Sequence, residues 1–157
     1  MTALVARTVA SPVGPLTLVA NAQALVELSF GDRPIRHEAT HIGSNAHVDR
    51  AARELDEYFE KKRTRFDVPL DVGGTPFQRS VYRALLDVKF GETKSYADIA
   101  AAIGKGKAFR AVGGANNKNP IAIIVPCHRI IGASGSLTGY GGGLPTKEWL
   151  LAHERLA

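Results

Sequence analysis

The chain has 157 residues, of which 45% are hydrophobic and 22% are charged, and it contains a single cysteine. This length is enough for one large or two small domains that bury a core without covalent staples, and one cysteine excludes an internal disulfide. No apolar run approaches the roughly 18 residues that a membrane-spanning helix needs, and the N-terminal residues lack the pattern of a secretory signal. We therefore expect a soluble cytoplasmic protein.

The formal net charge of +5 is unevenly distributed along the chain. Residues 1–72 hold nine Lys/Arg and ten Asp/Glu, whereas residues 73–157 hold eleven Lys/Arg and five Asp/Glu. A basic half favours a polyanionic partner such as nucleic acid, because neutralised phosphates release counterions and so drive binding. A basic surface without any partner is the alternative interpretation of the charge alone.

The first half of the chain has the pattern of a small α/β unit. Three short apolar segments bounded by turn residues predict strands over 4–10, 16–20 and 24–30. The polar stretch 31–45 predicts a loop, and apolar residues at helical spacing predict an amphipathic helix near 47–62. The histidines of this region lack cysteine or clustered carboxylate partners and predict no metal site: His37, His41 and His47.

The second half begins after a glycine pair and carries two clear helix starts. Thr75 and Gln78, with a proline between them, form a capping-box pattern. A second such pattern opens a helix over 95–103, the glycine-containing turn 104–106 follows, and a further helix is expected over 107–115. Two short helices joined by a tight turn predict a helix-turn-helix, whose second helix approaches DNA.

The cysteine follows an apolar run, Ile121–Val125, which predicts a buried strand that delivers it. It lies in the tetrapeptide Pro126-Cys127-His128-Arg129. Only the thiolate is a strong nucleophile, and cationic neighbours favour it, so this setting predicts a reactive thiol with a base beside it. The alternative is a small buried hydrophobic residue.

A glycine-rich loop and a last helix complete the chain. The loop has no nucleotide-binding signature, and Tyr140 within it is a candidate wall of a substrate pocket. The last helix opens near Pro145 and carries Glu154 in its final turn, where a carboxylate opposes the helix dipole. A cation must offset this, either Arg155 as a surface pair or His128 in the site.

Three stretches of the second half resemble the O6-alkylguanine-DNA alkyltransferases, which move an alkyl group from guanine onto their own cysteine. The matching stretches are 110–115, 119–129 with its Pro-Cys-His-Arg motif, and 147–154. The likeness is close over residues 75–155 and looser before them. In this context the motif is highly specific.

The resemblance implies an α+β fold with a ribonuclease H-like α/β domain over 1–72 and a winged-helix-like DNA-binding domain over 73–157. It implies direct-reversal DNA repair, in which O6-alkylguanine, and we expect O4-alkylthymine, is flipped out of duplex DNA and its alkyl group is transferred irreversibly to Cys127 in a single turnover. The expected partner is double-stranded DNA carrying such a lesion, with no cofactor, no metal and no membrane. We expect a monomer that is associated with the nucleoid of a prokaryote, and cooperative binding along DNA is left open.

The resemblance also implies roles for individual residues. Cys127 accepts the alkyl group, His128 acts as its base through a water, and Glu154 orients that histidine. Asn119 helps to hold the active-site turn, and Tyr96 donates a proton to the departing base.

Further residues are implied in DNA binding and in the base pocket. Those expected at DNA or in base flipping are Arg110, Tyr96, Lys107, Ala115, Asn116 and Arg129. Those expected to line the alkyl and base pocket are Tyr140, Gly141, Ile130 and Ser134. Where some relatives carry an apolar wedge on the recognition helix, this chain has Asn116 and Asn117.

Two other classes of function stay open at this point. A non-catalytic lesion binder would flip the base without accepting the alkyl group, although such relatives carry tryptophan at the position of Cys127. A thiol hydrolase would turn over, although such enzymes draw their cysteine and histidine from distant parts of the sequence. Stable transfer of mass to the protein separates both from the alkyltransferase.

Overall fold

The computed structural model describes residues 3–37, 40–135, 137 and 140–155. The chain has the mixed α+β class that the sequence predicts, and it divides into two compact units. The first unit contains residues 1–72 together with 120–122, and the second contains residues 73–119 and 123–157. None of the helices in the described ranges has the length and apolar character that a membrane span requires.

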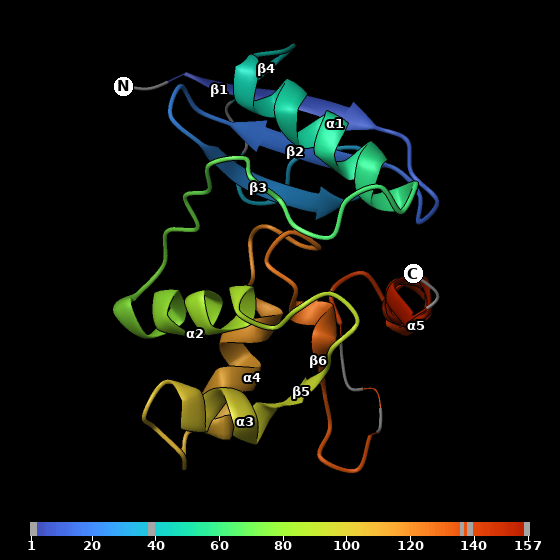
Figure 1. Ribbon diagram of the computed structural model, residues 1–157. Helices are drawn as coiled ribbons and strands as arrows, with labels where there is room; N and C mark the ends of the chain where they lie inside the picture. Colours follow the sequence, from blue (N-terminus) through green and yellow to red (C-terminus); the bar gives the residue numbers. More distant parts are fainter. Residues whose placement is uncertain (1–2, 38–39, 136, 138–139, 156–157) are drawn as a thin grey trace. The chain divides into compact units, whose positions relative to one another are not determined.

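The first unit is built on a four-stranded sheet in the order β3-β2-β1-β4 (Figure 1). Its strands are β1 (Leu4–Val9), β2 (Leu16–Ala20), β3 (Leu25–Phe30) and β4 (Thr40–Ile42). The first three are antiparallel neighbours and confirm the three predicted strands. Strand β4 pairs parallel with β1 inside the stretch that predicts a loop. Three residues are too few for an alternating pattern to be recognised in a polar segment.

Helix α1 (Ala46–Phe59) lies across one face of this sheet (Figure 1). It begins at Asn45, whose side-chain oxygen accepts a hydrogen bond from the Val48 N–H at 2.9 Å, and such a cap satisfies one of the unpaired amides of the first turn. The helix ends three residues before the predicted position 62. Its apolar stripe is buried as the periodicity predicts: Val48, Ala51, Ala52, Leu55 and Tyr58.

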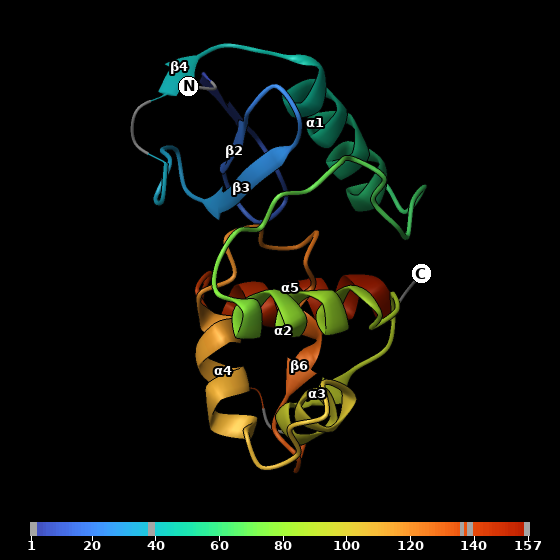
Figure 2. The same cartoon turned by 90° about the vertical axis from the view of Figure 1, so that its left-hand side faces the viewer.

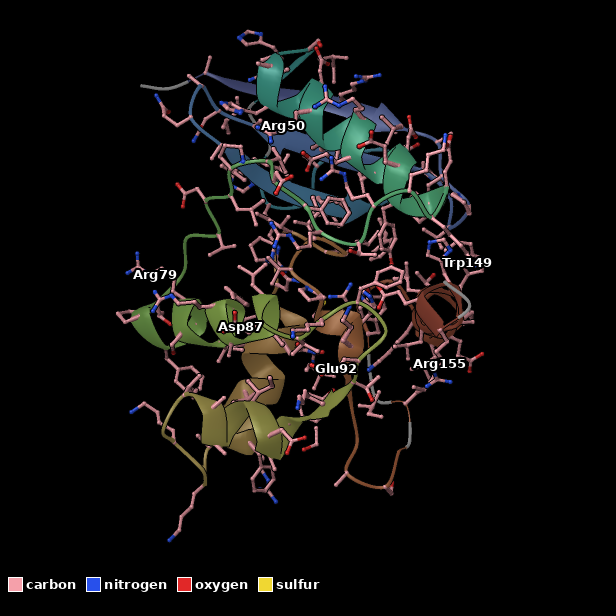
Figure 3. The ribbon with its side chains drawn as sticks, viewed as in Figure 1. Arg50, Arg79, Asp87, Glu92, Trp149 and Arg155 are labelled. Carbon is pink, nitrogen blue, oxygen red and sulfur yellow. The ribbon has the colours of Figure 1, made fainter. Side chains whose placement is uncertain are left out.

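Glu54 places a carboxylate inside the first unit, and its side chain is completely buried. One oxygen accepts hydrogen bonds from the backbone N–H groups of Asp67 at 2.9 Å and Val68 at 3.1 Å. The other accepts from Nε of Arg50, which projects from α1 (Figure 3), at 2.9 Å. The carboxylate therefore holds the segment after α1 against the helix.

The segment 120–122 extends the pairing of strand β3. The Leu28 N–H donates to the Pro120 carbonyl at 2.9 Å, and the Ala122 N–H donates to the Leu28 carbonyl at 3.1 Å. These two hydrogen bonds hold residues 120–122 within the first unit.

The second unit contains four α-helices, a short 3₁₀ helix and a two-stranded parallel sheet in its described part. The helices are α2 (Pro76–Leu86), α3 (Tyr96–Ala102), α4 (Phe109–Asn117) and α5 (Leu144–Arg155), and the strands are β5 (Lys94–Ser95) and β6 (Ile130–Ile131). Helices α2, α3 and α4 pack against one another (Figure 2). This arrangement contains the two short helices, α3 and α4, that the sequence predicts as a helix-turn-helix.

Both predicted capping boxes are confirmed. The Thr75 hydroxyl accepts from the Gln78 N–H at 3.1 Å, and the Gln78 side chain accepts from the Thr75 N–H at 3.0 Å. Ser95 and Asp98 make the same reciprocal pair at 3.0 Å and 2.9 Å. Each box satisfies two amides that a helix start leaves unpaired, so α2 and α3 begin where the sequence indicates.

Two predictions about the second half are wrong. The run 121–125 is a buried turn rather than a strand, with Ile123 at a φ of 70°. A short apolar run does not distinguish the two by periodicity, because both can be buried on all sides. Lys107 lies in the turn before α4 and not on the helix, which begins at Phe109.

We predict that Glu54→Ala lowers the free energy of unfolding by about 2–4 kcal/mol, because two backbone amides and Arg50 lose a buried, charged acceptor. Urea denaturation followed by circular dichroism measures the change. Glu60→Ala, which removes an exposed carboxylate paired with Lys62, is the matched control and should change stability by less than about 0.5 kcal/mol. Equal effects of the two substitutions would contradict the role assigned to Glu54.

Candidate active site

Cys127 opens a short 3₁₀ helix, Cys127–Arg129, and its residue surface is 5% exposed. The turn before it is fixed at the Val125 carbonyl, which accepts from the Asn119 side-chain amide at 2.7 Å and from the Cys127 N–H at 2.8 Å. The turn is therefore held by an amide side chain as well as by backbone bonds, so the sulfur starts from a defined position.

Glu154, in the last turn of α5, contacts the two residues that follow the cysteine. Its Oε2 lies 2.7 Å from Nε2 of His128 and 3.0 Å from Nη2 of Arg129, and its Oε1 accepts from Nε of Arg129 at 2.8 Å. The remaining Arg129 nitrogen, Nη1, donates to the Val88 carbonyl at 2.7 Å. Burial alone raises the pKa of Glu154, but the hydrogen bonds from His128 and Arg129 outweigh it and hold the pKa far below its usual range. Glu154 is therefore an anion and faces His128 rather than solvent.

His128 is completely buried, and burial lowers its pKa although Glu154 acts in the opposite direction. An ionised carboxylate only accepts hydrogen bonds, so the proton of the neutral imidazole must be on Nε2. Nδ1 then carries a lone pair, and within the described ranges no side-chain or backbone donor reaches it. His128 is thus arranged as a neutral base with one nitrogen ready to take a proton.

The Cys127 thiol is subject to opposing influences. Burial raises its pKa above the ordinary value and outweighs the Asn119 amide, the Lys147 ammonium and the Tyr140 hydroxyl, each of which lowers it. Lys147 is fully buried on α5, and its Nζ donates to the Ile130 carbonyl at 2.6 Å. A buried ammonium beside a buried thiol favours the thiolate, which is the form that attacks.

Lys147 is a residue of the site that the sequence motifs do not indicate. The signal is present in its position, since Lys147 precedes Glu154 by seven residues and therefore lies on the same face of a helix. Leu150 and Leu151 are buried between them. A lysine on the apolar face of α5, in register with the predicted Glu154, would have indicated a buried charge.

The predicted pocket residues differ in how far they are buried. Ile130 is completely buried in β6, and Tyr140 is half-buried with its hydroxyl acting on Cys127. Ser134 and Gly141 are exposed in the glycine-rich loop. The structure thus brings Tyr140 to the thiol.

The exposed residues predicted to meet DNA lie around helix α4. Arg110 is exposed in its first turn, and Lys107 is exposed in the turn before it. Tyr96, the first residue of α3, is half-buried, and its ring lies near Gly113 of α4, where an added Cβ would be 3.8 Å away. A Cβ on the exposed Gly114 would meet nothing within 4 Å of the described residues. Close packing inside the chain therefore does not require a glycine at position 114.

Three residues predicted to bind DNA are buried instead. Arg129 is 6% exposed because its guanidinium is taken up by Glu154 and the Val88 carbonyl. Ala115 is 4% exposed on the inner face of α4, and Asn116 beside it is 2% exposed. The helical spacing that places Arg110 outside turns Ala115 and Asn116 inward. With Arg129 bound to Glu154, none of the three presents a side chain to a duplex in this conformation.

Comparisons with known proteins agree over nearly the whole chain. The family model described as "6-O-methylguanine DNA methyltransferase, ribonuclease-like domain" matches residues 4–72, and "6-O-methylguanine DNA methyltransferase, DNA binding domain" matches residues 76–156. Methylated-DNA--protein-cysteine methyltransferase of Methanosarcina barkeri is 49% identical over 146 residues, which are 92% of this chain and 92% of that protein. The protein of the same name from Mycobacterium bovis is 49% identical over 150 residues, 95% of this chain and 91% of its own length.

A solved structure is similar to the same extent. The crystal structure of Mycobacterium tuberculosis OGT in complex with DNA has a TM-score of 0.88 and 49% sequence identity, and the match covers 97% of this chain and 93% of that one.

We predict that Lys147→Met shifts the pH dependence of Cys127 modification upward, because the thiol loses the ammonium that lowers its pKa. The rate of reaction with iodoacetamide, followed by mass spectrometry across pH, should fall several-fold near neutrality and recover at high pH. Lys89→Met removes an exposed lysine and should leave the profile unchanged. An unaltered profile in Lys147→Met would show that the ammonium does not act on the thiol.

Proposed function

The chain belongs to the 6-O-methylguanine DNA methyltransferase family, and we propose that Cys127 is the residue on which it receives the alkyl group. DNA repair by transfer of an alkyl group to a protein cysteine is the function of this chain. One observation carries the assignment of the residue: the sequence contains a single cysteine. The buried cluster around it supplies what the reaction needs, a base and a positive charge.

The proposed reaction is an in-line displacement at the alkyl carbon. The Cys127 thiol gives its proton to Nδ1 of His128. A bridging water relays the proton when the sulfur and Nδ1 are not in direct contact. The sulfur forms a bond to the alkyl carbon as the bond between that carbon and O6 of guanine breaks. The guanine takes the electron pair and is protonated by the hydroxyl of Tyr96. Lys147 favours the thiolate before the attack.

The lesion must leave the base stack before the sulfur can reach it, at a cost of a few kcal/mol. Arg110, exposed in the first turn of α4, fills the space left by the extruded nucleotide. Lys107, exposed before the same helix, contributes phosphate contacts. O6-alkylguanine is the proposed lesion, with O4-alkylthymine as a second, and the protein acts as a monomer.

The thioether that forms on Cys127 is stable, and the sequence offers no second cysteine to remove the alkyl group. Each molecule therefore reacts once. This stoichiometry distinguishes the proposal from a thiol hydrolase, which turns over, and from a lesion binder, which is not labelled.

We predict that incubation with a duplex containing one O6-methylguanine adds the mass of one CH2 unit to the peptide that contains Cys127, because a methyl replaces the thiol proton. Intact and peptide mass spectrometry measure the change, with an unmodified duplex and Cys127→Ala as controls. Repair of more lesions than there are protein molecules, or a methyl on another residue, would contradict the proposal. Tight binding without label would indicate a lesion binder instead.

We predict that Arg110→Ala slows transfer from duplex DNA by about tenfold or more, since the extruded state loses a filling side chain worth at least 1–2 kcal/mol. Transfer from the free base O6-benzylguanine should keep its rate, because no base has to be extruded. Arg79→Ala removes the same charge from the exposed face of α2 (Figure 3) and is the matched control, with little effect on either substrate. Equal slowing on both substrates would place the effect of Arg110 in the chemical step and not in extrusion.

A further inference from the structure

Asn116 is a polar residue buried between the DNA-facing helix and the reactive turn. It lies in the last turn of α4, and 2% of its surface is exposed. Its Nδ2 donates to the carbonyl of Cys127 at 3.4 Å. Its Oδ1 is buried, and no donor among the described residues reaches it.

This arrangement does not serve stability. The Cys127 carbonyl already accepts the backbone N–H of Ile130, so it would stay paired without Asn116. A long second hydrogen bond adds little, whereas a buried acceptor without a donor is unfavourable. An apolar side chain at this position would avoid the unpaired acceptor, so the amide calls for another explanation.

The explanation we infer is geometric. Asn119 holds the Val125 carbonyl, two residues before the sulfur, at 2.7 Å. Asn116 holds the carbonyl of Cys127 itself. The two amides come from the end of α4 and the residues just after it, and they restrain the backbone on both sides of the Cys127 Cα atom.

We propose that Asn116 is a positioning residue for alkyl transfer: it orients the Cys127 peptide so that Sγ is aimed along the line of attack on the alkyl carbon. This rests on the proposed function. In-line displacement depends steeply on alignment, and a misplacement of about 1 Å can cost about a hundredfold in rate. Asn116 affects the orientation of the Cys127 side chain and not the reactivity of its thiol, because the amide contacts the backbone carbonyl of Cys127.

The test compares two electrophiles in Asn116→Ala. With saturating O6-benzylguanine, which must be attacked in one orientation, the limiting rate constant should fall about tenfold or more while the concentration for half-saturation stays unchanged. With iodoacetamide, a small reagent that approaches freely, the rate should equal that of the unmodified protein. The melting temperature should be unchanged or raised by about 2–4 °C, since the unpaired acceptor is removed.

Two variants control for changes in the helix itself. Asn117→Ala makes the same substitution at the next, exposed position of α4 and should leave the limiting rate unchanged. Tyr82→Phe removes a buried hydrogen bond from the Tyr82 hydroxyl to the Ala115 carbonyl at 3.1 Å, one residue from Asn116. It should lower the melting temperature and leave the limiting rate unchanged, as a purely structural contact would.

The outcomes separate this inference from the function on which it rests. If the unmodified protein is not labelled at Cys127, the proposed function fails. If that labelling occurs, an undiminished limiting rate in Asn116→Ala overturns the inference. A rate loss that accompanies a lowered melting temperature, or an equal loss with iodoacetamide, also overturns it. A selective loss with O6-benzylguanine supports it.

Discussion

The proposed active site depends on one buried carboxylate. Glu154 binds His128 and Arg129, two consecutive residues of the reactive turn, and so ties the last helix to the segment that begins with Cys127. Its charge decides the chemistry of both partners: it fixes the proton of His128 on Nε2 and it neutralises the buried guanidinium. Without it, the turn would hold an unpaired cation and an imidazole of undefined tautomer.

The charges around the sulfur of Cys127 influence its ionisation. Arg129 and Glu154 form a buried ion pair, and the Lys147 ammonium lowers the pKa of the Cys127 thiol. Burial lowers the pKa of Lys147 itself, and Cys127 acts in the opposite direction. Burial disfavours the thiolate because the charge loses its hydration, and the nearby ammonium compensates for part of that cost. In the proposed reaction, the ammonium offsets part of the cost of forming a buried thiolate.

Much of the fold follows from local signals, and the failures occur where tertiary contacts decide. Capping boxes and apolar periodicity locate the helices. The position of Glu154 near a helix C-terminus predicts a cationic partner, with Arg155 and His128 as the alternatives; the structure gives contact with His128, and the cation is Arg129. The strand predicted over 121–125 is wrong because an apolar run buried on all sides has the same sequence pattern in a strand and in a turn. The burial of Arg129 and Lys147 is not predicted, because a sequence shows their charge and not the buried carboxylate or thiol that makes their burial possible.

The most direct test of the account is the protonation state of His128 in the resting protein. Nitrogen-15 shifts of its imidazole, measured by NMR near pH 7, should report a neutral ring with the proton on Nε2 and an unprotonated Nδ1. A doubly protonated ring, or a proton on Nδ1, would contradict the account, because neither form could take up at Nδ1 the proton that the proposed reaction moves from Cys127.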